Sequence, residues 1–156
     1  MPPCYMTRPP MSNLQVSSVT KSYAAKKLFE DVTVNPTKLQ TGLDGPGLEI
    51  WKWATVDAAD TCVPVACGNF ADKTVYFLKS SAFGGSMSLV GSPQADVAAD
   101  ADRRYVTLSD PNNNPLSGIS TETAEAIQQN AYFVKPEAGA GVTDVDVYLV
   151  LSSPRG

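Results

Sequence analysis

Residues 142–152, VTDVDVYLVLS, constrain the fold more than any other stretch of the chain. Four apolar side chains recur at every second position: Val145, Val147, Leu149 and Leu151. Asp144 and Asp146 fall on the opposite side of this alternation. Because successive side chains of a strand point to opposite faces, the pattern predicts a strand with one buried and one solvated face.

Similar but shorter stretches recur along the chain and are separated by clusters of turn-forming residues. The clearest of them are 48–56, 73–80, 103–109 and 131–136, the last ending at Pro136. Residues 13–20 form a plausible first strand, although the alternation slips in phase before Val19. Gly84 and Gly85 predict a hairpin that joins 73–80 to a short partner strand before Gly91. About seven to nine short strands are expected in all.

Residues 120–130, STETAEAIQQN, are the clearest helix prediction, whereas 23–34, YAAKKLFEDVTV, stays open between a helical turn and a strand. Ser120 or Thr121 can cap its start, Glu122 lies in the first turn, and Asn130 can end it. The sequence therefore predicts a mainly β protein, an antiparallel β-sandwich or barrel-like fold with one short helix near 120–130. The expected organisation is one β-rich domain over 14–153, preceded by an extended N-terminal arm over 1–13.

The composition excludes several classes of function. The chain has 156 residues and no histidine, which excludes Ser-His-Asp and Cys-His catalysis and histidine-containing metal sites. Charged residues make up 18% of the chain, and the net charge is −4. No basic stripe is present, so nucleic acid is not an expected partner. We expect a protein that is not an enzyme, although lysine or paired-carboxylate catalysis stays formally open.

The cysteines and aspartates give weak metal-binding patterns. Cys4, Cys62 and Cys67 are an odd number of cysteines, and a lone C-x4-C spacing is a poor zinc signature. Buried apolar thiols are the favoured interpretation, and a local Cys62–Cys67 disulfide stays open. The acidic pattern consists of four aspartates: Asp96, Asp100, Asp102 and Asp110. Their spacing matches no EF-hand loop, so a solvated loop and a hairpin turn are the favoured interpretation. No metal or cofactor is expected.

Two tryptophans, Trp51 and Trp53, share one face of the predicted strand 48–56. Exposed aromatic side chains would offer a stacking platform for sugars, whereas buried ones would form part of the core. The core interpretation is favoured, and the carbohydrate-binding β-sandwich is kept as an alternative.

The N-terminal arm, MPPCYMTRPPMSN, is rich in proline and methionine. Proline removes backbone donors, so the arm fits neither a helix nor a central strand. Its apolar composition predicts docking on a partner; the candidate binding residues are Pro2, Pro3, Tyr5, Met6, Arg8, Pro9, Pro10 and Met11. A disordered leader, or a true start at Met11, is the alternative. No apolar run suggests a signal peptide or a membrane span.

Three segments on a low-charge background rich in Ser, Thr, Ala and Gly resemble small virion proteins of tailed bacteriophages, particularly head decoration (cement) proteins. The segments are TVYFLKSSAFGGSMSLVGS, RRYVTLSDPNNNPLSGIS and DVDVYLVLSS. The resemblance implies a β-rich structural protein, often trimeric, that binds the major capsid protein lattice on the capsid surface. It would be made in the host cytoplasm and use no cofactor. A tail or fibre component shares the same composition and is the main alternative.

Overall fold

The structure is a computed structural model that describes residues 32–39 and 47–154. The chain divides into two units, Met1–Val32 and Thr33–Gly156. The predicted arm over 1–13, its boundary with the following domain and the predicted strand over 13–20 all lie outside the described residues.

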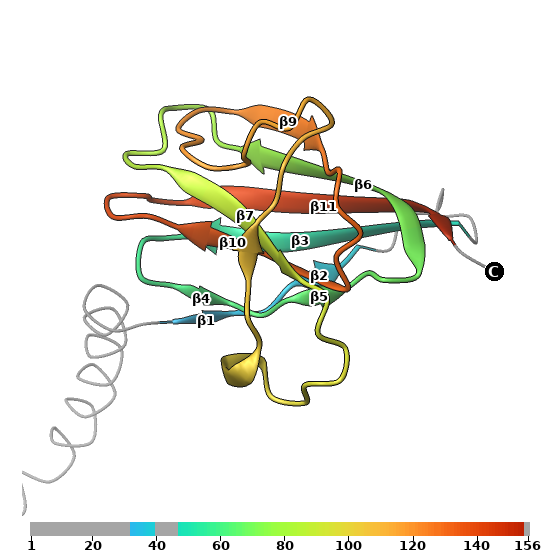
Figure 1. Cartoon of the computed structure of the whole chain (residues 1–156). Coiled ribbons are helices and arrows are strands. Elements are labelled where there is room, and N and C mark those ends of the chain that lie inside the picture. Colours follow the sequence, from blue (N-terminus) through green and yellow to red (C-terminus); the bar gives the residue numbers. More distant parts are fainter. Residues whose placement is uncertain (1–31, 40–46, 155–156) are drawn as a thin grey trace, which may run out of the picture. The chain divides into compact units, whose positions relative to one another are not determined.

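Two open antiparallel sheets form the second unit (Figure 1). The five-stranded sheet has the order β2-β3-β11-β6-β9 and consists of β2 (Thr37–Lys38), β3 (Leu48–Val56), β11 (Val145–Pro154), β6 (Phe70–Leu78) and β9 (Thr123–Ala126). The four-stranded sheet has the order β5-β10-β7-β8 and consists of β5 (Val65–Ala66), β10 (Phe133–Ala138), β7 (Met87–Ser92) and β8 (Val106–Thr107). A short parallel pair joins β1 (Thr33–Val34) to β4 (Thr61–Cys62).

The core lies between the sheets and confirms the alternation in 142–152. Strand β11 buries the apolar residues of one face completely, namely Val145, Val147, Leu149 and Leu151. It is the central strand, paired with β3 on one side and β6 on the other. The mainly β class and the antiparallel sandwich are therefore confirmed, and the described strands form open sheets and not the barrel-like alternative.

The predicted helix over 120–130 is wrong. Residues Thr123–Ala126 form β9 at the edge of the five-stranded sheet, and Ile127 extends the pairing by donating its backbone N–H to the Lys73 carbonyl at 2.9 Å. Alanine and glutamate favour a helix by intrinsic propensity, but that preference amounts to only tenths of a kcal/mol per residue. Pairing with β6 and burial of Ile127 outweigh it. Among the described residues, the helical structure is one 3-10 turn, η2 (Asp100–Asp102).

The predicted hairpin at Gly84–Gly85 is also wrong, because β6 and β7 belong to different sheets. The two glycines instead meet the loop 139–141, and the carbonyl of Ser86 accepts the Gly139 N–H at 2.8 Å. A methyl group added to Gly85 would collide with the carbonyl oxygen of Ala140, and one added to Gly141 would lie 2.5 Å from that of Gly84. We call the segments 84–86 and 139–141 the glycine clasp. It joins two loops through backbone atoms alone.

Strand β10 continues through Pro136 to Ala138, two residues beyond the predicted end. Pro136 lies opposite Leu89, whose N–H and carbonyl bond to Leu116 and Leu108 on the far side of β7. The Leu89–Pro136 pair therefore needs no hydrogen bond from Pro136. On its other side β10 pairs with β5 only at Phe133 and Val134, so the missing proline donor is harmless there as well.

Candidate functional site

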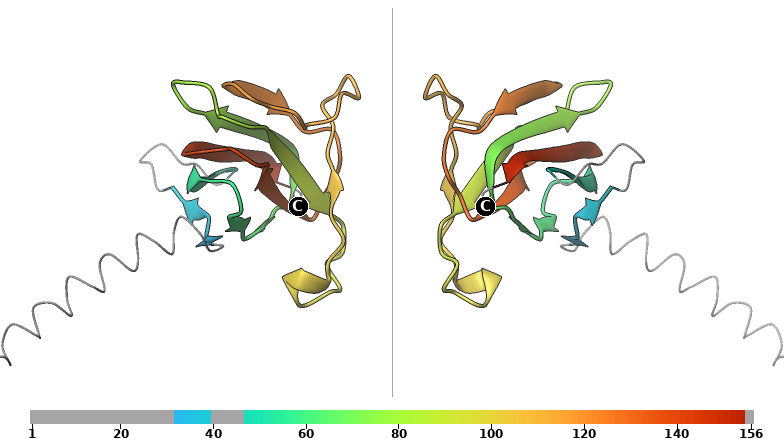
Figure 2. Two further views of the ribbon diagram at one scale, coloured as in Figure 1. Left: turned by 90° about the vertical axis from the view of Figure 1, so that its left-hand side faces the viewer. Right: turned by 90° about the vertical axis from the view of Figure 1, so that its right-hand side faces the viewer.

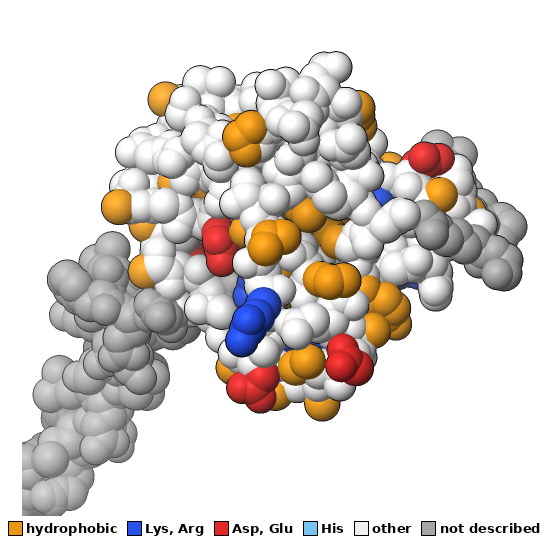
Figure 3. Space-filling view, viewed as in Figure 1, with side chains coloured by type: hydrophobic (Ala, Val, Ile, Leu, Met, Phe, Trp, Pro, Cys, Tyr) orange, Lys and Arg blue, Asp and Glu red, His pale blue; other side chains and the backbone are white. Residues whose placement is uncertain are grey.

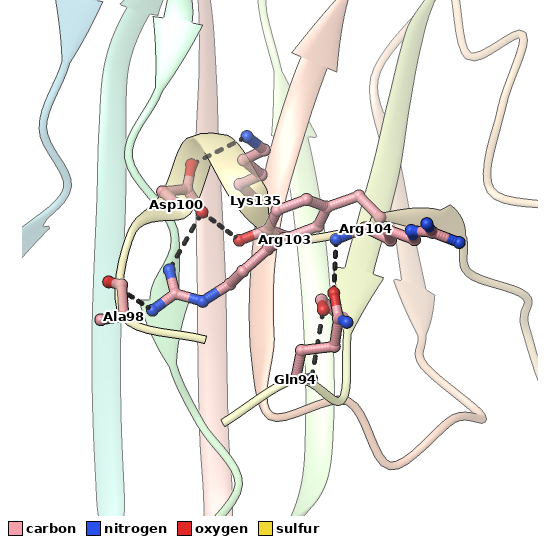
Figure 4. A network of polar contacts seen from close by, with 8 residues as sticks. Gln94, Ala98, Asp100, Arg103, Arg104 and Lys135 are labelled. Atoms are coloured by element: carbon pink, nitrogen blue, oxygen red, sulfur yellow. Dashed lines mark hydrogen bonds and ion pairs between the residues drawn. The ribbon is translucent and has the colours of Figure 1, made fainter. Parts of the chain in front are cut away.

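The densest group of charged side chains surrounds Asp100, in the segment between β7 and β8. One oxygen of Asp100 accepts hydrogen bonds from the Tyr105 hydroxyl at 2.6 Å and from Arg103 Nη1 at 3.1 Å. Its other oxygen lies 3.2 Å from Lys135 Nζ of β10 (Figure 4). We call Asp100, Arg103, Tyr105 and Lys135 the Asp100 cluster.

Ring contacts reinforce the Asp100 cluster. The Arg103 guanidinium carbon lies 3.7 Å from the centre of the Phe133 ring, and Lys135 Nζ lies 4.3 Å from the centre of the Tyr105 ring. Phe133 and Lys135 stand on alternate positions of β10, so both point to the same side of the four-stranded sheet. The segment between β7 and β8, yellow in Figure 2, projects beyond the strands. The cluster attaches this segment to the sheet.

The electrostatics of the cluster favour fixed charge states. Burial alone would raise the pKa of Asp100, but hydrogen bonds from Tyr105 and Lys135 outweigh it and hold that pKa below its usual value. Burial, with the hydrogen bond to Asp100 next in importance, raises the pKa of the Tyr105 hydroxyl. Asp100 is therefore an anion and Tyr105 a neutral donor at physiological pH. Neither is poised to exchange a proton near neutrality, so the geometry fits a structural role.

Arg103 completes the attachment of the loop. Its Nη2 donates to the carbonyl of Ala98 at 3.3 Å, and 10% of its side chain is exposed. Gln94 fixes the next residue, because its side-chain oxygen accepts the Arg104 N–H at 2.6 Å. Figure 3 shows Lys or Arg and Asp or Glu side chains standing among hydrophobic ones on the face seen in Figure 1.

The four aspartates of the weak calcium pattern serve different parts of the chain. Asp110 closes a separate turn: it accepts the backbone N–H groups of Asn112 and Asn114 at 2.9 and 2.8 Å. These bonds, with the Asn114 side chain foremost, lower the pKa of Asp110. Asp96 and Asp102 are exposed. The predicted hairpin turn is confirmed at Asp110, and no group of three potential metal ligands occurs within 32–39 and 47–154.

Both described cysteines are free, buried thiols, as the favoured interpretation predicted. Burial raises the pKa of Cys62 to about 12 and that of Cys67 to about 11. The Lys73 ammonium partly opposes the shift at Cys67, and Lys73 itself is 3% exposed and donates to the Phe70 carbonyl at 2.7 Å. Thiols with such pKa values are poor nucleophiles at neutral pH. Cys4 lies outside the described residues.

The tryptophans do not form an exposed platform. Trp53 is fully buried, and its indole N–H donates to the Val63 carbonyl at 2.8 Å. Trp51 is half-buried against the core and donates to Glu49 at 3.0 Å. The core interpretation is confirmed. The large apolar side chains that are exposed are Tyr76, Leu78, Val106 and Tyr132.

Part of the Asp100 cluster carries a signal in the sequence, and the rest does not. Asp100 and Arg103 are three residues apart, and opposite charges at that spacing are a usable signal. Lys135 and Phe133 lie more than thirty residues away on β10, and no local pattern connects them with Asp100. The candidate residues of the arm, from Pro2 to Met11, lie outside the described residues.

Comparisons with known proteins identify no family. No family model and no curated protein matches the chain. One solved structure, the K1 cleaved adhesin domain of Lys-gingipain (Kgp) from Porphyromonas gingivalis W83, overlaps 78% of this chain and 72% of its own. The identity is 10% and the TM-score is 0.29, too low for an inference about function. Within the described ranges, no helix has the length and apolar character needed to cross a membrane.

Proposed function

We propose that this protein is a virion structural protein, a decoration protein that binds the major capsid protein lattice and stabilises it without catalysis. The observation that carries the proposal is how the sandwich uses its side chains. Asp100 and Asp110, two of the four aspartates in the acidic pattern, bind groups of their own chain. Large apolar side chains such as Tyr76 and Val106 are left exposed. That distribution fits attachment through a surface.

The N-terminal arm supplies part of the attachment in this proposal. Tyr5, Met6 and Met11 are the apolar anchors, and Arg8 pairs with an acidic group of the capsid. A proline-rich segment loses little conformational entropy on docking because its backbone is already restricted. The protein acts as a homo-oligomer, with a trimer as the expected state. Several arms on one oligomer would then raise affinity through effective concentration.

Sedimentation with undecorated capsids tests the proposal. The capsids are assembled from the major capsid protein whose gene lies nearest to the gene of this protein. They are mixed with the full-length protein or with a variant lacking residues 1–12. We expect the full-length protein to pellet with capsids and the truncation to bind at least about tenfold more weakly, equivalent to about 1.4 kcal/mol. Equal binding by both forms would assign attachment to the sandwich alone. No binding by either would contradict the capsid proposal.

Two alternatives give different outcomes in parallel assays. A tail or fibre component would bind purified tails and not capsids. A carbohydrate-binding module would bind immobilised glycans, but the platform it needed is absent from the described part, because Trp53 is buried. Tyr76 and Tyr132, which are 37% and 39% exposed, would have to replace it.

A further inference from the structure

The outer face of the five-stranded sheet is unusually apolar for a solvent-facing surface. On β11, Tyr148 and Val150 alternate with the buried residues and so point away from the core. Cross-strand partners share a face: Tyr148 lies opposite Tyr76 of β6, and Val150 lies opposite Ile50 of β3. Leu78 of β6 extends this row and is 36% exposed. We call Ile50, Tyr76, Leu78, Tyr148 and Val150 the apolar row.

Small, uncharged side chains border the apolar row on the β9 side. Ala124 and Ala126 of β9 lie opposite Tyr76 and Thr74, and Thr74 in turn lies opposite Val150. The described charged residues beside the row are at one end of it, where Asp146 of β11 lies opposite Leu78 and 3.5 Å from Lys52 of β3. Antiparallel sheets that face water on one side normally carry polar side chains there. An exposed patch of this kind marks an interaction surface.

The charges at the corners of this face indicate what covers it. Lys52 of β3 lies beside Tyr148, and Asp72 of β6 lies beside Ser152. These two residues therefore occupy diagonally opposite corners, two strands apart and four residues apart along β11, with Val150 midway between them. The corners carry opposite charges. Such an arrangement is self-complementary under a two-fold rotation.

We propose that the outer face of the five-stranded sheet is a two-fold interface between two copies of this chain. A two-fold axis in the interface plane near Val150 brings Lys52 of each copy to Asp72 of the partner subunit. It also places the central Tyr76 close to Tyr76 of the partner subunit. An interface of this type is isologous, because the same patch is used by both copies. The inference goes beyond the proposed function and holds whether or not the protein binds capsids; it replaces the trimer expected there with a dimer.

The size of the face sets the expected affinity. Four strands about 4.8 Å apart and about six residues of about 3.4 Å each give a flat footprint of roughly 400 Å². Stable interfaces usually bury about 800 Å² on each partner. The dimer should therefore dissociate in the micromolar range. Lys52 also lies 3.5 Å from Asp146 of its own chain, which keeps its ammonium directed over this face.

Sedimentation velocity of the full chain from 1 to 200 µM is the first measurement. We expect a shift from one to two times 16.5 kDa across this range. A monomer throughout would overturn the proposal. A mass of three copies would support the trimer expected from the sequence and would overturn the dimer proposal.

A charge-reversal pair makes the test specific to this geometry. Lys52→Asp places two acidic groups together at each corner of the dimer, and Asp72→Lys places two basic groups there. Each variant alone should dimerise at least about tenfold more weakly than the wild type. An equimolar mixture of the two variants should recover association, because both corners of the mixed dimer then pair opposite charges. Failure of the mixture to associate, with both variants folded by circular dichroism, would contradict the two-fold arrangement.

Matched controls lie on the other side of the sandwich. Asp96→Lys and Arg104→Asp reverse exposed charges in the segment between β7 and β8, far from the apolar row in the sheet order. They should leave the dimer unchanged. Tyr76→Ser, at the centre of the interface, should weaken it without charge reversal. Equal weakening by the controls would show a general charge effect and overturn the assignment of this face.

Discussion

The glycine clasp and the Asp100 cluster both hold loops onto the same sandwich, but they do so by opposite means. The clasp joins 84–86 to 139–141 through backbone atoms, with the Gly139 N–H donating to the Ser86 carbonyl at 2.8 Å. Just beyond the clasp, the Thr143 N–H donates to the Phe83 carbonyl at 3.0 Å. The cluster joins the segment between β7 and β8 to β10 through charged side chains. Backbone contact is insensitive to pH and salt but tolerates no added atoms. Charged contact tolerates changes of shape but depends on protonation and ionic strength.

The largest expected effect is at the clasp. Gly85→Ala forces a methyl group against the Ala140 carbonyl, where neither backbone segment can move freely. We expect a loss of roughly 3 kcal/mol in the free energy of unfolding, at the upper end of the cost of overpacking. Urea denaturation measures it. Gly118→Ala is the matched control, because Gly118 has a positive φ of 69° but open space around it. It should cost about 1 kcal/mol from backbone strain alone, and equal losses at both sites would contradict the collision.

A smaller effect is expected at the cluster. Asp100→Asn keeps the shape of the side chain but removes its ion pairs with Arg103 and Lys135. Because a third of the Asp100 side chain is exposed to water, we expect a loss of only about 1 kcal/mol. The control is Asp102→Asn, an exposed neighbour whose change should be near zero. If the two substitutions were indistinguishable in urea denaturation, the cluster would not stabilise the fold.

Acid should separate the two regions. The pKa of Asp100 is lower in the folded state than its usual value, so its stabilisation is complete above about pH 4 and is lost as pH falls through the folded pKa. The difference in stability between wild type and Asp100→Asn should therefore shrink below about pH 4. The difference between wild type and Gly85→Ala should stay constant over the same range. Thermal melts from pH 7 to pH 2.5 measure both differences. If both differences shrank in parallel as the pH fell, the predicted contrast between the two regions would be wrong.

The smallest effect is that of salt. In 1 M NaCl the screening length falls to about 3 Å, which weakens the partly exposed contacts of Asp100. We expect the cost of Asp100→Asn to drop by a few tenths of a kcal/mol, while the cost of Gly85→Ala is unchanged within error. Denaturation at low and high salt tests this prediction. A drop at the clasp would mean that charges contribute there too.

Neither of these regions was visible as a unit in the sequence. Gly84 and Gly85 favour a hairpin because paired glycines are common in tight turns, but their partner is a loop more than fifty residues away. The aspartate spacing around Asp100 favours a solvated acidic loop, but Asp100 binds Lys135 of β10. The sequence identifies residues that permit close approach or carry charge. It does not identify what approaches them.

The sequence alone determined the central part of the five-stranded sheet. The alternation in β11 and the apolar residues of β3 encode their own burial, because a strand with one apolar face is stable only against a core. The predicted strand 48–56 agrees with the observed Leu48–Val56. The tertiary structure decided that Thr123–Ala126 form a strand, that β10 continues through Pro136, and that Asp100 pairs with Lys135. In each case the local preference was weak or ambiguous, and hydrogen bonds and packing with distant strands supplied the larger free energy.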